Sequence, residues 1–207
     1  MSTLTDDLRL CTSATRGLFG AAAASCALLE EDGHLRYVAA DGKGAAEIVG
    51  VRMPVGRGIA GWAVTSEQPL AVREVASDPR FARDVAESTR YVPQAILAAP
   101  VVAEGEVIGV LQVLDPTVDA AADWSLDVLG TLAAHVGVIV GAHAGDQPSP
   151  AGTPASGGVH AAGAGEDETQ SLVNRVSALL AIGSPQADAT AGALLQVVAA
   201  YLRHGRS

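Results

Sequence analysis

Three aromatic residues in the middle of the chain have the side-chain types best suited to hold a small ligand. Aromatic residues make up only 3% of the sequence, yet Trp62, Phe81 and Tyr91 fall in one stretch with Arg57 and Asp78. Flat rings with polar edges are common in small-molecule pockets. We expect these five residues to bind a ligand if the fold forms a cavity beneath them. The alternative is that the rings anchor the core under surface loops.

The other reactive side chains do not form a recognisable catalytic or metal site. Cys11 and Cys26 have neither a CxxC nor a metal-ligand spacing, which favours small buried thiols. His135 and His143 are two helical turns apart without nearby carboxylates, so we predict no metal site. The Gly56-Arg57-Gly58 segment could hold an anion at a helix start, or it simply turns the chain. We predict no catalytic residues and no enzyme activity.

Composition and charge narrow the class of partner. Thirteen Lys+Arg against twenty-three Asp+Glu give a formal charge of −10 and no visible basic patch, which disfavours nucleic acid and anionic membranes. The acidic start lacks the basic and apolar regions of a signal peptide, and no apolar run is long and uninterrupted enough to span a bilayer. We therefore expect a soluble, cytoplasmic protein.

Two hairpins and two flanking helices account for most of the first 143 residues. Apolar residues at intervals of three and four predict an opening amphipathic helix that ends near Gly17 or Gly20. Residues 24–30, a turn containing Asp-Gly, and alternating residues from Leu35 predict the first hairpin. The apolar runs 96–103 and 107–114 predict a second hairpin of central strands, and 120–143 has a long helical pattern.

Shorter elements should lie between the hairpins. Residues 52–55 predict an edge strand because Pro54 cannot donate to a sheet ladder, and 69–72 predict another brief strand. Residues 59–65 predict a short helix. A further helix should begin with Asp78 as its N-cap and Pro79 at its first position, and run through 82–89. Residues 145–165 are rich in Gly, Ala, Pro and Ser and predict a flexible linker, and the apolar stripes in 166–207 predict a two-helix segment.

The first 143 residues resemble the GAF domain family. Two blocks carry the resemblance: VGRGIAGWAVTSEQPLAVREVASDPRF from Val55 to Phe81, and AILAAPVVAEGEVIGVLQVLD from Ala95 to Asp115. The resemblance implies an α+β fold with an antiparallel central sheet, long terminal helices on one face, and short helices and loops over a pocket on the other. The sensory domain would then span residues 1–144, with the C-terminal helical hairpin appended.

The resemblance also allows candidate cofactors and ligands of the family to be compared with this sequence. No histidine falls in the segments that would cover the pocket, as an axial haem ligand would require, and residues 84–91 lack the cysteine that bilin-binding members use. The dispersed signature of cyclic-nucleotide-binding members cannot be assembled, since Lys43 is the sole lysine. The reductase branch depends on several cysteines. We therefore leave the cofactor unidentified.

Two functional interpretations remain open. In the first, a small-molecule-binding sensory domain without an output domain of its own signals through its terminal helices to a separate partner protein. In the second, a ligand-free module dimerises and uses residues 166–207 as an adaptor for another protein. The resemblance implies parallel homodimers through the terminal helices in both cases.

Overall fold

The computed structural model describes residues 3–117 and 123–145. The predicted linker at 145–165, apart from Gly145, and the predicted two-helix segment at 166–207 lie outside the described residues.

The centre of the described part is a six-stranded antiparallel sheet in the order β3-β2-β1-β6-β5-β4. Its strands are β1 (Ala23–Leu29), β2 (His34–Gly42), β3 (Arg52–Pro54), β4 (Leu70–Val72), β5 (Ile96–Ala103) and β6 (Glu106–Leu114). Both predicted hairpins are present. The two short strands lie at opposite edges, so the position inferred from Pro54 is confirmed.

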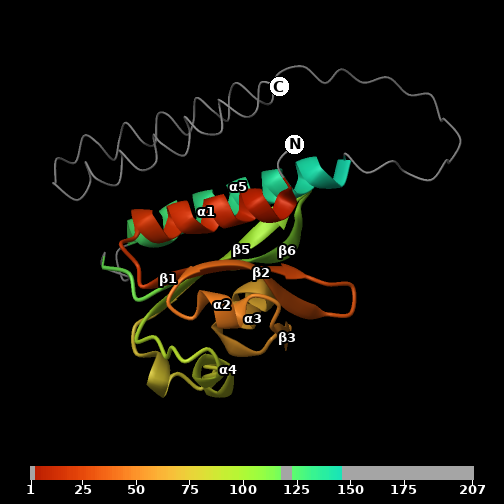
Figure 1. Ribbon diagram of the computed structural model, residues 1–207. Coiled ribbons are helices and arrows are strands. Elements are labelled where there is room, and N and C mark those ends of the chain that lie inside the picture. The colour runs from red at the N-terminus through yellow and green to blue at the C-terminus, as the bar shows by residue number, and fades with distance from the viewer. Residues whose placement is uncertain (1–2, 118–122, 146–207) are drawn as a thin grey trace, which may run out of the picture. The chain divides into compact units, whose positions relative to one another are not determined.

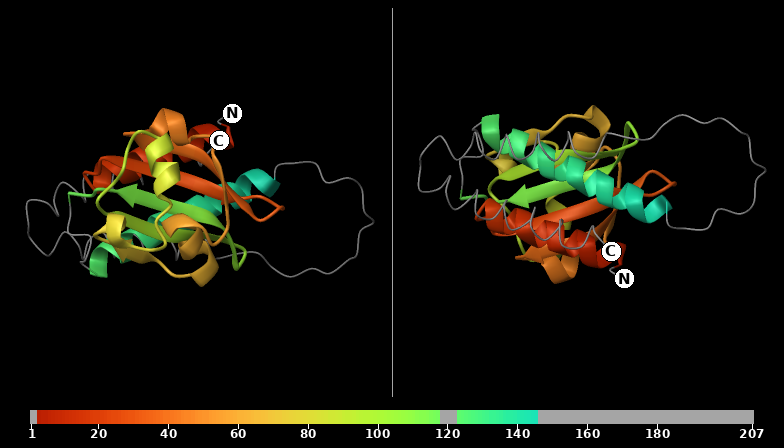
Figure 2. Two further views of the ribbon diagram at one scale, coloured as in Figure 1. Left: turned by 90° about the horizontal axis from the view of Figure 1, so that it is seen from below. Right: turned by 90° about the horizontal axis from the view of Figure 1, so that it is seen from above.

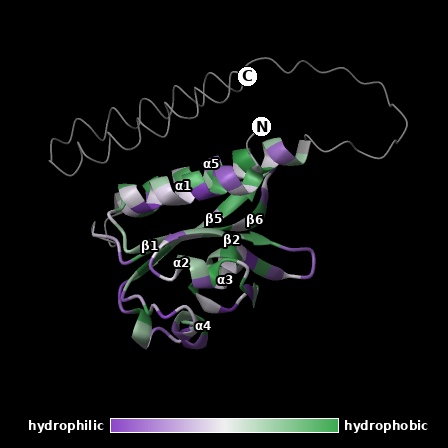
Figure 3. Ribbon diagram, viewed as in Figure 1, coloured by the Kyte–Doolittle hydropathy of each residue, from purple (hydrophilic) through white to green (hydrophobic). Residues whose placement is uncertain are grey.

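Helices cover the two faces of this sheet differently, as Figures 1 and 2 show. The long helices α1 (Leu4–Leu18) and α5 (Asp123–Gly145) lie side by side on one face. The opposite face is covered by short elements: α2 (Ala45–Ile48), α3 (Gly58–Ser66), the 3-10 turn η1 (Val75–Ser77) and α4 (Arg83–Ser88). The predicted α+β architecture is therefore confirmed for the described residues. In Figure 3, β5 and β6 between these layers are mainly hydrophobic.

Helix α1 is fixed at its start by a capping box. The Thr3 hydroxyl oxygen accepts a hydrogen bond from the Asp6 backbone N–H at 3.2 Å, and the Asp6 carboxylate accepts one from the Thr3 backbone N–H at 3.4 Å. Its buried side chains are Leu8, Thr12, Thr15 and Leu18. The helix therefore packs one apolar face on the sheet, as its periodicity predicts.

Helix α5 packs unusually closely on strand β5. A Cβ added at Gly137 would lie 1.9 Å from the carbonyl oxygen of Val102, so only glycine allows this approach. Val128, Leu129, Ala133 and Val136 are buried on the same side. By length and composition residues Ser125–Ala144 are apolar enough to cross a membrane, but a core helix of a soluble protein passes the same test. The close packing on β5 is that of a core helix.

An irregularity in β2 changes which side chains face the pocket. Cys26 pairs with Ala39 and Ala27 pairs with Tyr37, so Val38 is an extra residue in the ladder. One inserted residue reverses the side-chain alternation beyond it. Leu35 and Tyr37 therefore pack in the core on the side of α3 and Ala39 does not, whereas a regular alternation would place all three residues on one face.

One predicted helix start is wrong. Asp78 does not cap the helix that follows it, because α4 begins at Arg83 with Ala82 at the N-cap. The Asp78 carboxylate instead accepts hydrogen bonds at 2.9 Å from both the backbone N–H and the Nε of Arg80. A local turn between residues 78 and 80 thus replaces the first helical turn.

Candidate ligand-binding site

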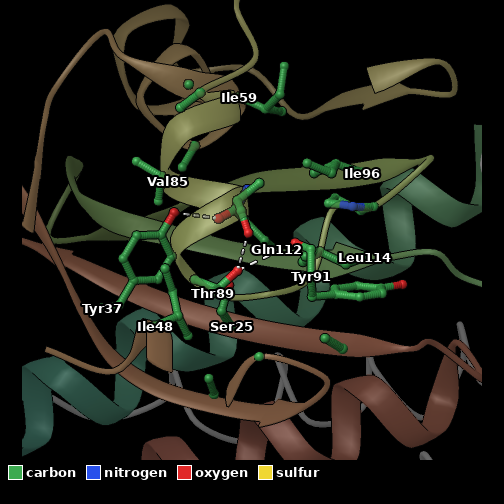
Figure 4. A pocket seen from close by; sticks show the side chains of 18 of the residues that line it. Ser25, Tyr37, Ile48, Ile59, Val85, Thr89, Tyr91, Ile96, Gln112 and Leu114 are labelled. Carbon is green, nitrogen blue, oxygen red and sulfur yellow. Dashed lines mark hydrogen bonds between the residues drawn. The ribbon is translucent and has the colours of Figure 1, made fainter. Parts of the chain in front are cut away.

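A pocket of about 90 Å³ lies between the sheet and its short covering helices. Its floor comes from β1, β2, β5 and β6, and its cover comes from α2, α3, α4 and the segment after α4 (Figure 4). Most of the lining is apolar and includes Ile48, Met53, Ile59, Phe81, Val85, Ile96 and Leu114. Drug-sized ligands need pockets of roughly 300–1,000 Å³, so this space suits a much smaller molecule.

Two polar side chains lie opposite each other in the middle of the floor. Ser25 on β1 pairs in register with Gln112 on β6, and both line the pocket. The hydroxyl of Tyr37 donates to Oε1 of Gln112 at 3.1 Å. Burial raises the pKa of Tyr37, so its hydroxyl stays protonated and remains a donor. The amide of Gln112 is thereby held with its oxygen already occupied.

The Ser25 hydroxyl and the Gln112 amide nitrogen are available to a ligand. The two side chains are only 6% and 5% exposed, and neither of these atoms has a hydrogen-bond partner among the described residues. Every fully buried side-chain nitrogen or oxygen in the described part does have a partner. Both atoms must therefore retain some accessible surface, and the pocket that they line provides it.

Thr89 lies at the C-terminal end of α4, where the start of α2 approaches it. Its hydroxyl donates to the carbonyl oxygen of Ala86 at 2.8 Å and of Tyr91 at 3.4 Å. Gly44 approaches from the start of α2 with a φ of +71°, and a Cβ there would lie 3.1 Å from the carbonyl oxygen of Thr89. The positive φ favours glycine, and a Cβ at this position would be tight against Thr89. This contact fixes how closely the two covering helices meet at the rim.

Tyr91 and Lys43 form the other side of the rim. The Tyr91 hydroxyl donates to the Asp115 carboxylate, which also accepts from the backbone N–H groups of Gln94 and Ala95, both at 2.8 Å. Burial and the bond to Asp115 raise the pKa of Tyr91. The Lys43 ammonium lies 5.2 Å from the centre of the Tyr91 ring, a cation–π distance.

Two of the five predicted site residues line the pocket, and three do not. Phe81 and Tyr91 are in the lining, whereas Trp62, Arg57 and Asp78 are outside it. Trp62 is 45% exposed on α3, and its ring lies 5.1 Å from the guanidinium of Arg80, which is paired in turn with Asp78. The three residues outside the lining therefore contact other protein side chains. A ligand-binding role for any of the five stays a prediction.

Arg57 forms an ion pair with another residue of the same chain. Its guanidinium Nη2 lies 2.5 Å from the Asp84 carboxylate on α4, and both side chains are exposed. This pair lowers the pKa of Asp84. Arg57 therefore joins the segment before α3 to α4 across the outside of the cover.

Sequence reasoning missed most of the lining, including the polar residues Ser25, Gln112 and Lys43. Ser25 and Gln112 each interrupt a long apolar strand, and a lone polar residue in a buried strand is a signal that it has a specific partner or faces a cavity. Lys43 carries no such signal, because it lies in a polar turn between elements. It is the one charged residue among those that line the pocket, and no carboxylate lines it.

The two thiols lie outside this pocket. Burial raises the pKa of Cys11 to about 11 and that of Cys26 to about 12, so both are protonated near neutral pH. Neither residue lines the pocket. Among the described residues, no group of three or more His, Cys, Asp or Glu side chains could hold a metal ion.

Comparisons with known proteins agree with this geometry. The GAF domain family matches residues 4–140. A 65-residue segment is 34% identical to a probable 3',5'-cyclic phosphodiesterase of Caenorhabditis elegans; it covers 31% of this chain and 9% of that protein. The match thus spans less than a tenth of the length of this relative.

Solved structures show the same fold. The GAF domain of an Acinetobacter phosphoenolpyruvate-protein phosphotransferase is 25% identical, with a TM-score of 0.58 over 69% of this chain and 85% of that one. The corresponding domain from Coxiella burnetii is 20% identical, with a TM-score of 0.62 over 70% and 86%. GAF domains are generally regulatory domains that bind small molecules. By its sequence match and its fold, this chain belongs to the GAF domain family.

Proposed function

We propose that this chain is a non-catalytic sensory domain that binds a small molecule in the pocket beneath α3 and α4. The observation that carries this proposal is the pair of buried polar side chains, Ser25 and Gln112, whose free atoms line an otherwise apolar pocket. A core that served only for packing would have apolar residues there, because an unsatisfied buried polar group is destabilising by roughly 1–3 kcal/mol.

A ligand signal would pass to the terminal helices through Asp115. This carboxylate binds Tyr91 at the pocket rim and two backbone N–H groups just before β5, while the Asp115 carbonyl oxygen accepts from the N–H of Ala22 at 3.3 Å. One residue thus connects the pocket rim, the start of β5 and the segment between α1 and β1. Ligand-dependent movement of Tyr91 would alter both connections and change how α1 and α5 are presented to a separate partner protein.

Occupancy of the pocket can be tested with a variant that fills it. Ala86→Leu adds bulk to a lining position on α4, whereas Ala46→Leu adds the same bulk to an exposed residue of α2 outside the lining. A broad small-molecule screen by thermal shift should find compounds that stabilise the natural chain and the Ala46 variant but not the Ala86 variant. A ligand at 100 times its Kd should add about 2.7 kcal/mol to the free energy of unfolding. A screen without any such compound would contradict the proposal.

The outer surfaces of the long helices favour a second function, a homodimer that acts as an adaptor. Leu10 on α1 and Val138 on α5 are 57% and 47% exposed, and no Asp, Glu, Lys or Arg occurs on α5 after Asp127. Exposed apolar residues on neighbouring helices are typical of an association surface. We propose parallel dimers through this surface, with residues 166–207 contributing to partner binding.

Sedimentation equilibrium can test the dimer. Val138→Asp should shift the chain toward the monomer, because it places a charge in the centre of the proposed interface. Val49→Asp is the control, since Val49 is 40% exposed next to α2 and away from α1 and α5. Equal association of both variants and the natural chain would contradict a dimer through α5.

A further inference from the structure

The lining of the pocket contains one charged side chain, and it is positive. Lys43 is exposed at its rim, and no aspartate or glutamate lines the space. The nearby Asp115 carboxylate is held by the Tyr91 hydroxyl and two backbone N–H groups, whereas the Lys43 ammonium has no carboxylate partner among the lining residues. A single cation beside an apolar cavity attracts an anion and repels a second cation. The Lys43 ammonium contacts the face of the Tyr91 ring, which leaves its N–H donors for a ligand.

The interior of the pocket supplies further donors. The Gln112 amide is oriented by Tyr37 so that its nitrogen, with two N–H donors, is the free end. Ser25 is its cross-strand neighbour on β1 and also lines the pocket, and Figure 4 labels both residues. These groups complement an uncharged oxygen acceptor such as a ketone or hydroxyl oxygen. Because both donors are uncharged, they do not compensate a buried carboxylate as the ammonium group of a lysine would.

The start of α3 also contributes positive electrostatic potential to the pocket. Gly58, Ile59 and Ala60 all line the pocket, and their backbone N–H groups belong to the first turn of a nine-residue helix. No side chain caps this turn, and it contains no acidic residue. No side chain of α3 itself therefore neutralises the positive end of its dipole.

From these features we infer that the ligand is a small organic monocarboxylate whose carboxylate faces Lys43 and whose chain carries a second, uncharged oxygen for Ser25 and Gln112. This inference rests on the proposed function and specifies the ligand class of the same pocket. The apolar lining, which includes Ile59 and Ile96, would contact the short carbon chain. An amino acid is excluded on charge, because no lining carboxylate is present to pair with its ammonium group.

A set of five-carbon probes separates the parts of this inference. 2-Oxopentanoate and 4-oxopentanoate carry both the carboxylate and a ketone oxygen at two spacings. Pentanoate lacks the ketone, 2-aminopentanoate adds an ammonium group, and pentan-2-one lacks the carboxylate. By calorimetric titration of the full chain, we expect at least one oxo acid to bind about tenfold more tightly than each of the other three probes.

Variants of Lys43 at the rim and of Ser25 on the floor test which residue binds the carboxylate and which binds the uncharged oxygen. Lys43→Met should weaken binding of the oxo acid about tenfold, while Lys43→Arg should retain it, because the charge is kept. Ser25→Ala should reduce the affinity for the oxo acid but not for pentanoate. Lys43 is exposed, so its variants should unfold at the same temperature as the natural chain, which thermal melts would check.

The outcomes distinguish this inference from the function on which it rests. Equal binding of pentan-2-one or 2-aminopentanoate, or unchanged oxo-acid affinity in Lys43→Met, would overturn the monocarboxylate assignment. If all five probes fail but the broad screen finds a neutral or cationic compound that the Ala86→Leu variant rejects, the assignment is wrong and the sensory function stands. If no compound in either set binds in a pocket-dependent way, both are wrong.

Discussion

Alternate residues of the same strands face opposite sides of the sheet, and the two sides differ in how densely they are packed. On the side of α1 and α5, Cys26, Leu111 and Val113 are completely buried, and Gly137 brings a helix against the backbone of β5. On the other side, Ser25 and Gln112 lie next to these residues in sequence but border a pocket. Dense packing on one face provides the stability that lets the other face keep an unfilled space.

The largest difference between the two faces should be in thiol accessibility at two consecutive residues. In a chain with Cys11 replaced by alanine, the thiol introduced by Ser25→Cys should react with a small thiol reagent far faster than Cys26. The first borders the pocket, whereas Cys26 has no exposed surface and can react only after the structure opens. Labelling rates at pH 8, with the sites identified by mass spectrometry, provide the measurement. Comparable rates would show that the helix-covered face is not closed.

Replacing Gly137 should cause the largest loss of stability. In Gly137→Ala the new methyl group would meet the Val102 carbonyl oxygen at 1.9 Å, so α5 must move off β5. We expect a loss of about 3 kcal/mol in the free energy of unfolding, measured by urea denaturation. Gly141→Ala on the same helix is the control. Nothing lies within 4 Å of a Cβ there, so alanine should be neutral or stabilising by up to about 1 kcal/mol.

On the pocket face, stability should depend on the pairing of Tyr37 with Gln112. Gln112→Leu leaves the buried Tyr37 hydroxyl without its acceptor, which should lower the free energy of unfolding by about 1–2 kcal/mol. Tyr37→Phe combined with Gln112→Leu should recover most of this loss, because both polar partners are then removed. A double-mutant cycle from urea denaturation measures the coupling. Additive losses would mean that the hydrogen bond contributes little.

The smallest effect concerns the partly exposed ion pair that joins α1 to β2. The Arg16 guanidinium lies 2.6 Å from the Asp41 carboxylate and lowers the pKa of that group. Because the pKa is lower in the folded state, the pair stabilises the fold above the ordinary aspartate pKa and loses this effect as the pH falls below it. Arg16→Met should be less stable by about 0.5 kcal/mol at pH 7. This difference should shrink as the pH falls through the lowered pKa of Asp41, and a constant difference would rule out the charge as its cause.

Sequence patterns predicted the six strands, both long helices, α3 and α4 of the described part, but not the short elements α2 and η1. In α1 and in the two hairpins, one face of each element is buried along most of its length. This produces the regular spacing of apolar residues from which the elements are predicted. The pattern failed where one inserted residue changed the phase. Val38 cannot be recognised as a bulge from its type, and the resulting presence of Ala40 rather than Ala39 in the pocket lining depends on pairing with β1.

The pocket lining was harder to predict than the fold because it depends on side-chain direction. Helix α3 is apolar on nearly every side, so its sequence does not indicate that Trp62 is the exposed position. Arg57 and Asp78 pair with oppositely charged neighbours, and the partner of Arg57 comes close only in the folded cover. Phe81 and Tyr91 reach the lining because each adjoins a short covering element.

The position of Lys43 has a practical consequence for spectroscopy. Since it is the sole lysine, reductive methylation with ¹³C-formaldehyde would label one side-chain amine besides the N-terminal amine. Its proximity to the Tyr91 ring would move the methyl resonance through the ring current, and displacement of the amine from the ring would change that resonance. The chain thus contains a single built-in NMR reporter at the mouth of its pocket.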